Sequence, residues 1–240
     1  QLLVEAMMKE VLSQEEAINR IFLFDSHGLV TKDREGLTPL KQKFAHELEP
    51  QSTFLDAIGE VKPTAIVGCA AQAGSFNAYV LSAMARINER PIIFALSNPT
   101  SRSECTAREA YTYTEGKCLF ASGSPFPQVE LNGKTFIPRQ SNNSYVFPGI
   151  GLGLVTASPR VVPQSVFLSA AEALSKKVSD EDLENGSLFP SLTKIREVSQ
   201  SIAAAVAEQC FTAGVAGVPK PKDLSEAIQA AMYKPVYAQI

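Results

Sequence analysis

Polar side chains that could hold a small ligand follow directly after a run of apolar residues. Residues 91–96 read Pro-Ile-Ile-Phe-Ala-Leu, and Ser97 and Asn98 come next. An apolar run without alternation that ends in turn residues is typical of a parallel strand covered on both faces. Ligands of open α/β sheets bind beyond the carboxyl ends of such strands, so Ser97 and Asn98 are candidates to contact one. The alternative is that Asn98-Pro99 only opens a loop.

Two further stretches have the same arrangement of an apolar run followed by small or polar residues. Asp25 follows the run at residues 21–24, and the small-residue loop at 69–74 follows the run at 65–68. An acid at the end of a strand can hold the adenosine ribose of a dinucleotide, although an ordinary turn has the same composition. Small residues allow backbone to approach a ligand, and they serve close helix–strand packing equally well.

The groups that would carry out a reaction are not evident in the sequence. It contains no G-x-G-x-x-G and no metal-binding pattern such as H-E-x-x-H. Because Asp25 normally follows the glycine loop by about 20 residues, that loop and the first strand are expected just before Gln1. His27 and His46 have no evident carboxylate partner and are interpreted as surface or capping residues. The chain is therefore predicted to hold a ligand without the catalytic groups.

The elements that would position these residues alternate between strand and helix. Apolar runs near residues 21, 65, 92 and 118 are separated by helical patterns, which predicts an α/β fold with a doubly wound, Rossmann-like parallel sheet that lacks its first strand and glycine-rich loop. Asn132-Gly133 predicts a hairpin, and residues beyond 164 are largely helical in pattern. We expect a dinucleotide-binding domain over residues 1–158, incomplete at its amino terminus, and a helical extension over 159–240 packing on it.

Composition narrows the classes of function. The 240 residues carry a formal net charge of −3 and a pI near 5.6, which disfavours general binding to nucleic acid or a membrane surface. No apolar run has membrane-spanning length, and the first ten residues include acids and no basic leader, unlike a signal peptide. Four widely spaced cysteines fit reduced thiols in an intracellular protein, without separating the cytoplasm from an organelle lumen.

Several motifs in order resemble the malic enzymes, which oxidatively decarboxylate malate to pyruvate and carbon dioxide while reducing NAD or NADP. They lie at residues 24–30, 62–64, 88–100, 104–107, 120–126 and 142–149. The resemblance runs almost end to end and implies the dinucleotide-binding portion and carboxyl-terminal helices of a longer enzyme. Malic enzymes carry their catalytic Tyr and Lys, and the acidic ligands of Mg²⁺ or Mn²⁺, further upstream. The resemblance thus implies no catalytic residue and no metal ligand in this chain, which alone is expected to be inactive.

The resemblance also implies roles for individual residues. Asn98 matches an asparagine that touches malate and the nicotinamide ribose, and Asn143, together with Asn142, matches a pair that contacts malate and the nicotinamide end. An amide suits these roles because it can donate to a carboxylate and accept from a hydroxyl without adding charge. The full set of expected cofactor contacts is Asp25, Ser26, Lys41, Gly68, Cys69, Ala70, Ala71, Ser97, Asn98 and Asn143.

The choice between NADP and NAD depends on three of these positions. Asp25 alone favours NAD, because a carboxylate accepts from ribose hydroxyls and repels a 2′-phosphate. Ser26, and Lys41 three residues before Phe44, resemble malic enzymes that prefer NADP. A lysine ammonium on the phosphate would make a charge-assisted contact. We predict NADP, with NAD as the alternative.

The resemblance implies partners and leaves two other functions open. Malate and pyruvate, an upstream catalytic domain of the same enzyme and a homo-oligomer are expected, and nucleic acid and membrane are not. A non-catalytic nucleotide-binding or regulatory module is the main alternative, and another decarboxylating hydroxy-acid dehydrogenase is a third reading. The sequence departs from the family at Arg139 and Ser141, where glycine or another small residue is usual. A positive φ at Arg139 would be strained.

Overall fold

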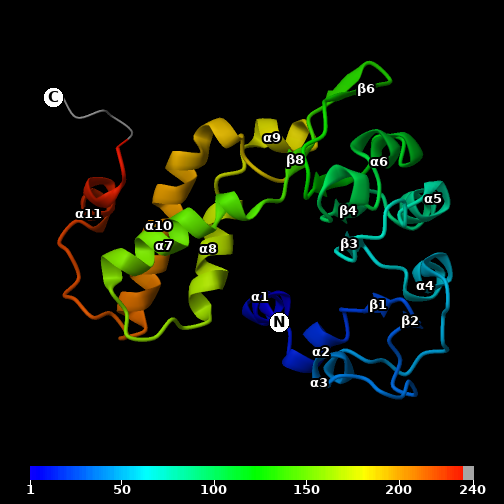
Figure 1. Cartoon of the computed structure of the whole chain (residues 1–240), viewed down its shortest axis with the longest axis horizontal. Helices are drawn as coiled ribbons and strands as arrows, with labels where there is room; N and C mark the ends of the chain where they lie inside the picture. The colour runs from blue at the N-terminus through cyan, green and yellow to red at the C-terminus, as the bar shows by residue number, and fades with distance from the viewer. Residues whose placement is uncertain (235–240) are drawn as a thin grey trace. The chain divides into compact units, whose positions relative to one another are not determined.

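The computed structural model describes residues 1–234 and divides into two compact units (Figure 1). The sheet unit comprises residues 1–141 and 181–188, and the helical unit comprises 142–180 and the chain from 189 onward. Residues 235–240, the end of the expected helical extension, lie outside the described part. The division falls between Ser141 and Asn142 rather than after residue 158, because the helix at 147–157 packs against the carboxyl-terminal helices.

The sheet unit is built on a four-stranded, all-parallel sheet. Its order is β3-β4-β5-β8, with β3 (Ala65–Gly68), β4 (Ile92–Ala95), β5 (Leu119–Ser122) and β8 (Arg139–Gln140). Helix α5 (Ala78–Ile87) connects β3 to β4, and 3-10 helix η1 (Thr100–Arg102) and α6 (Ala107–Tyr113) lie between β4 and β5. The predicted α/β class and the three strands near 65, 92 and 118 are confirmed.

The predicted strand at residues 21–24 is wrong as a member of this sheet. Strand β1 (Phe24–Asp25) instead pairs antiparallel with β2 (Gly28–Leu29) in a separate two-stranded sheet. Among the described strands, β3 has only β4 as a neighbour, and Val67 on β3 is 54% exposed. Strand pairing depends on the partner available, which an apolar run does not specify. The sequence therefore indicated a strand near residues 21–24 but not the strand with which it pairs.

Side-chain caps mark the starts of several helices. Ser13 and Glu16 form a capping box at α2, and Thr106 and Glu109 form another at α6. Side-chain oxygens of this kind satisfy backbone N–H groups that a helix start leaves unpaired. The remaining helices before β3 are α1 (Leu2–Lys9), α2 (Gln14–Ile18), α3 (Pro39–Lys43) and α4 (Phe54–Val61).

The predicted hairpin is also present. Strands β6 (Val129–Leu131) and β7 (Lys134–Phe136) pair antiparallel around Asn132 and Gly133, whose φ values are 52° and 76°. Two consecutive positive φ angles are what a tight type I′ turn requires, and Asn-Gly supplies them at low cost.

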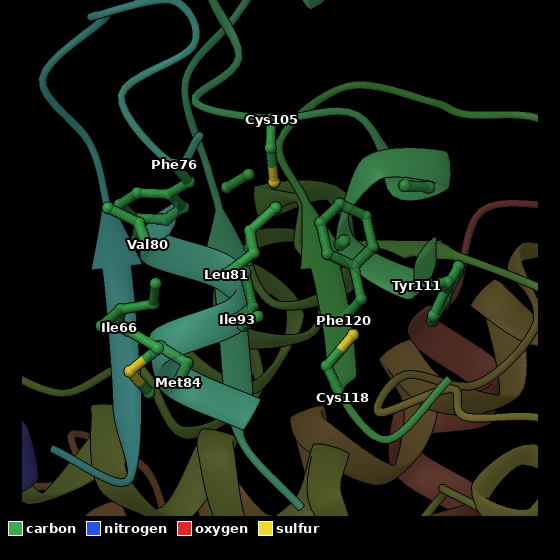
Figure 2. Packing of buried hydrophobic residues seen from close by; sticks show 14 of the residues in the cluster. Ile66, Phe76, Val80, Leu81, Met84, Ile93, Cys105, Tyr111, Cys118 and Phe120 are labelled. Atoms are coloured by element: carbon green, nitrogen blue, oxygen red, sulfur yellow. The ribbon is translucent and has the colours of Figure 1, made fainter. Parts of the chain in front are cut away.

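The core of the sheet unit fills the space between strands and helices. Figure 2 shows Ile66, Ile93 and Phe120 on the strands with Leu81 and Met84 of α5 beside them. Each of these side chains is at most 4% exposed. Burial of this apolar surface, worth roughly 25 cal/mol per Å², fixes the strands and therefore the position of the loops at their carboxyl ends.

The helical unit packs around one long helix, α10. Its members are η2 (Asn143–Tyr145), α7 (Phe147–Ala157), α8 (Ser165–Ser175), η3 (Leu192–Lys194), α10 (Ile195–Thr212) and α11 (Leu224–Ala231), and α9 (Asp180–Glu184) lies mostly in the sheet unit. Gly149 and Gly153 let α7 approach α10, because an added Cβ would lie 2.6 Å from Ile202 Cβ and from Ala203 O, respectively. Both distances are shorter than any carbon contact in a packed core.

Candidate functional site

The hydroxyl of Ser97 joins the ends of β3 and β4. The backbone N–H of Ala71, in the loop after β3, donates to Ser97 Oγ at 2.9 Å. Ser97 Oγ donates in turn to Glu104 Oε1, and Ser97 N donates to Glu104 Oε2 at 3.3 Å. Ser97 and Glu104 are 6% and 1% exposed. Ser97 therefore anchors the loop, and its expected contact with the cofactor stays a prediction.

The loop Cys69–Ala71 is exposed, whereas Gly68, the residue before it, is buried and tightly packed. An added Cβ at Gly68 would lie 2.5 Å from Glu104 Cγ, so the space beside Gly68 is filled by the glutamate. Close packing, the alternative considered for this small-residue stretch, explains Gly68. Cys69, Ala70 and Ala71 remain accessible, and Ala71 has a φ of 53°.

Asn98 is exposed, and its side chain is held by a residue that follows β5. Ser124 Oγ donates to Asn98 Oδ1 at 2.7 Å. Gly123 packs closely against Leu96 and Asn98, since an added Cβ would lie 2.2 Å from Leu96 O and 2.7 Å from Asn98 Nδ2. Residues after β3, β4 and β5 thus meet at one edge of the sheet, where ligands of such sheets bind.

Asp25 lies in a compact cluster of charges in the sheet unit. Arg34 Nη2 donates to both Asp25 oxygens at 3.1 Å, and Lys41 Nζ donates to Oδ2 at 2.5 Å. The backbone N–H of His27 donates to Oδ1 at 2.8 Å. Burial of the carboxylate disfavours its charge, but the bonds from Lys41, His27 and Arg34 outweigh this and hold the pKa of Asp25 well below its usual range.

The sequence analysis placed Asp25 at the adenosine ribose and Lys41 at a 2′-phosphate, whereas in the structure the two side chains bond to each other. Both carboxylate oxygens are already engaged, and one carboxylate with two cations carries a formal charge of +1. Arg34 Nη1 donates to the carbonyl oxygens of Gly28 and Leu29, so it closes the β1–β2 hairpin. Ser26 is exposed, with Oγ 3.2 Å from His27 Nδ1.

Asn142 and Asn143 belong to the helical unit. Asn142 Oδ1 accepts from the backbone N–H of Ser144 at 2.9 Å and caps η2, while Asn143 is exposed at its start. Arg139 lies in β8 paired with Ala121 and has no positive φ, so the condition under which it would be strained is not met. Its guanidinium lies 3.8 Å from Asp182.

Sequence reasoning missed three residues that build these sites: Arg34, Glu104 and Ser124. Arg34 is nine residues from Asp25 and carries no local pattern that indicates pairing. Glu104 follows a polar turn, where an exposed side chain is the ordinary expectation. Its proximity to Gly68 depends on the packing of the connection after β4, which only the fold reveals.

The described residues include neither a cluster of metal-ligand side chains nor a helix that could span a membrane. Within residues 1–234, no three His, Cys, Asp or Glu side chains are grouped as metal ligands would be. In the same range, no helix has the length and apolar character needed to cross a bilayer. His46 Nε2 lies 2.8 Å from Ile21 O and its ring stacks on Phe22 at 4.2 Å, and His27 is exposed.

A family model described as "Malic enzyme, NAD binding domain" matches residues 1–211. The chain belongs to the malic enzyme family. The chain is 45% identical over 241 aligned residues to the NAD-dependent mitochondrial malic enzyme of Ascaris suum, covering 100% of this chain and 38% of that protein. It is 48% identical to the NADP-dependent malic enzyme of Rattus norvegicus, covering 100% of this chain and 42% of that protein. The resemblance stated from the motifs is confirmed.

A solved structure supports the fold of this malic enzyme chain. The crystal structure of Entamoeba histolytica malic enzyme superposes with a TM-score of 0.68 at 22% identity, over 88% of this chain and 42% of that one. The chain thus spans about two fifths of the length of these relatives. Since the two relatives named above use different dinucleotides, family membership alone leaves the cofactor open.

Proposed function

We propose that this chain supplies the dinucleotide site and part of the substrate site of an enzyme that oxidatively decarboxylates malate to pyruvate and carbon dioxide with reduction of NADP. The observation that carries the proposal is the meeting of the Cys69–Ala71 loop with Ser97, Asn98 and Ser124 at the carboxyl edge of the sheet, in a member of this family. That edge is where an open α/β sheet binds a nucleotide.

The charge cluster at Asp25 supports NADP over NAD. The side chain of Arg34 is committed to Asp25 and to two carbonyl oxygens, whereas Lys41 makes one bond and is 39% exposed. An ammonium has three N–H donors, so Lys41 can keep its bond to Asp25 and donate to a phosphate. The formal charge of +1 offsets the repulsion that Asp25 alone would exert on a 2′-phosphate. Ser26, small and exposed, leaves room beside it.

The proposed substrate contacts are amides. Asn98 Oδ1 accepts from Ser124 and Nδ2 donates to Leu96 O at 3.4 Å, which orients the amide and leaves the second N–H of Nδ2 to donate to a malate carboxylate. We assign Asn143 and Asn142 to malate and the nicotinamide end, with Asn142 additionally capping η2. The bound dinucleotide supplies the hydride acceptor, and these side chains would bind and orient the two reactants. Mg²⁺ or Mn²⁺, the catalytic Tyr and Lys, and a homo-oligomeric state are proposed for the complete protein.

The test is malate-dependent reduction of NADP by the full-length protein with added Mn²⁺. We expect reduction of NADP at lower cofactor concentration than NAD, and formation of pyruvate. The 240-residue chain alone should give no turnover. NADP binding by the full-length protein without malate turnover would instead indicate a non-catalytic nucleotide-binding module. No binding of either dinucleotide would overturn both readings.

A further inference from the structure

Glu104 is a buried acid whose carboxylate is linked to the Cys69–Ala71 loop through Ser97. It is 1% exposed, and both carboxyl oxygens accept hydrogen bonds from Ser97, one from the hydroxyl and one from the backbone N–H. A buried acid at this exposure is uncommon, because its desolvation must be offset by bonds of this kind. Its side chain also occupies the space where Gly68 would carry a Cβ.

These bonds fix which way the Ser97 hydroxyl points. A serine hydroxyl has one proton, and here that proton is donated to Glu104 Oε1. The oxygen can therefore present only lone pairs to Ala71, whose backbone N–H needs an acceptor at 2.9 Å. Without the acid, the hydroxyl proton could turn elsewhere, and the bond to Ala71 would lose its fixed direction.

Ala71 needs this support more than its neighbours do. Its φ of 53° lies in the left-handed region, which is unfavourable for alanine, and it is exposed. The later part of the same loop is tied down by backbone bonds, from Gly74 N to Ser103 O at 3.3 Å and from Phe76 N to Glu104 O at 3.0 Å. The bond at Ala71 passes through a side chain, so it can be changed by substitution.

We propose that Glu104 is a positioning residue for dinucleotide binding, which orients the Ser97 hydroxyl so that it holds the Cys69–Ala71 loop in its binding conformation. The inference rests on the proposed function, because it assigns this loop to the cofactor. It gives Ser97 a supporting role toward the loop in place of direct cofactor contact. A pre-formed loop strengthens binding by removing the cost of ordering it when the ligand arrives.

The test is a double-mutant cycle in the full-length protein, with the dissociation constant of NADPH as the measured quantity. Glu104→Gln has nearly the same shape but replaces one of the two acceptor oxygens with an NH2 donor, so in this geometry it can accept from the hydroxyl or the backbone N–H of Ser97 but not from both. We expect Glu104→Gln and Ser97→Ala each to weaken binding about two-fold to ten-fold, the range for one net hydrogen bond. The double variant should be no weaker than Ser97→Ala alone.

Ser103→Ala is the matched control. Ser103 is also buried in the same connection, and its hydroxyl donates to Cys105 O at 2.8 Å rather than to the loop. This variant should leave the dissociation constant within about two-fold of wild type. The KM for the dinucleotide should rise in the Glu104 and Ser97 variants with little change in kcat, as expected when only binding is impaired.

Hydrogen exchange at the Ala71 amide provides a second measurement that needs no ligand. Faster exchange at Ala71 in both Glu104→Gln and Ser97→Ala, with global unfolding unchanged, supports the proposal. Additive effects in the cycle, an equal loss in Ser103→Ala, or unchanged exchange at Ala71 would overturn it. If the wild-type protein binds no dinucleotide, the proposed function fails, whereas binding that the variants leave unaltered refutes only this inference.

Discussion

Lys41→Gln tests the assignment of the charge cluster to the 2′-phosphate of NADP. The substitution removes one positive charge and keeps the length of most of the side chain. Asp25 would retain Arg34 on both oxygens and the backbone N–H of His27 on one. The β1–β2 hairpin therefore keeps its connections, and the change falls on the most exposed cation of the cluster, since Lys41 is 39% exposed and Arg34 is 19% exposed.

Lys41→Gln should affect both the stability of the protein and the KM for NADP. The pair of Lys41 with Asp25 is partly solvated, so its loss should lower the free energy of unfolding by at most about 1 kcal/mol. A charge-assisted contact to phosphate is worth roughly 1.5–3 kcal/mol. At about 1.4 kcal/mol per factor of ten, the KM for NADP should rise about ten-fold to a hundred-fold. NAD has no 2′-phosphate, so its KM should change by less than about two-fold.

The assay is malate-dependent reduction of each dinucleotide at saturating malate and Mn²⁺. Lys43→Gln is the matched control, because it removes the same charge from the same helix, where Lys43 Nζ lies 5.9 Å from the centre of the Phe44 ring. It should leave the ratio of the two KM values unchanged. Equal effects of Lys41→Gln on both dinucleotides, or an equal effect of Lys43→Gln, would refute the assignment of the phosphate to Lys41.

Three predictions concern stability. Tyr111 is fully buried, and no described residue bonds its hydroxyl; Tyr111→Phe should therefore raise the free energy of unfolding by about 1 kcal/mol in urea denaturation, and a loss of stability would show that the hydroxyl is satisfied. Lys62 ends α4 with a φ of 49°, so Lys62→Gly should add about 0.5–1 kcal/mol and raise Tm, while a lower Tm would contradict the strain. The pKa of Asp25 is lowered by folding, so its stabilisation is complete above the ordinary Asp pKa of about 4 and is lost as the pH falls toward the folded-state value. The stability difference between wild type and Asp25→Asn should shrink below about pH 4; a constant difference would exclude this origin.

The sequence predicted the elements that depend on neighbours in the chain. The Asn132-Gly133 turn is decided within a few residues, and the hairpin occurs as expected. The capping boxes at Ser13 and Thr106 likewise depend on residues three apart in the chain. The strand at residues 21–24 was mispredicted as part of the sheet because its place depends on a partner strand, which a local pattern does not identify.

The candidate site was predictable in its location but only partly in its contacts. Placing Ser97 and Asn98 at the end of a buried strand required only the apolar run before them. Their bonding partners come from other connections, Glu104 for Ser97 and Ser124 for Asn98. Such pairs are 7 and 26 residues apart and have no fixed spacing, so only packing brings them together.

Asp25, at the end of β1, and Glu104, in the connection between η1 and α6, have a common property that bears on the ligand. Each has both oxygens occupied by donors from the protein, Asp25 by Arg34, Lys41 and His27, and Glu104 by Ser97. Neither therefore presents a free carboxylate oxygen to a ligand in this conformation. The groups left exposed are a lysine ammonium, the Asn98 amide and the backbone of the Cys69–Ala71 loop. Acids that are occupied by protein donors, together with exposed donor groups, favour anionic ligands, and the proposed dinucleotide and malate are both anions.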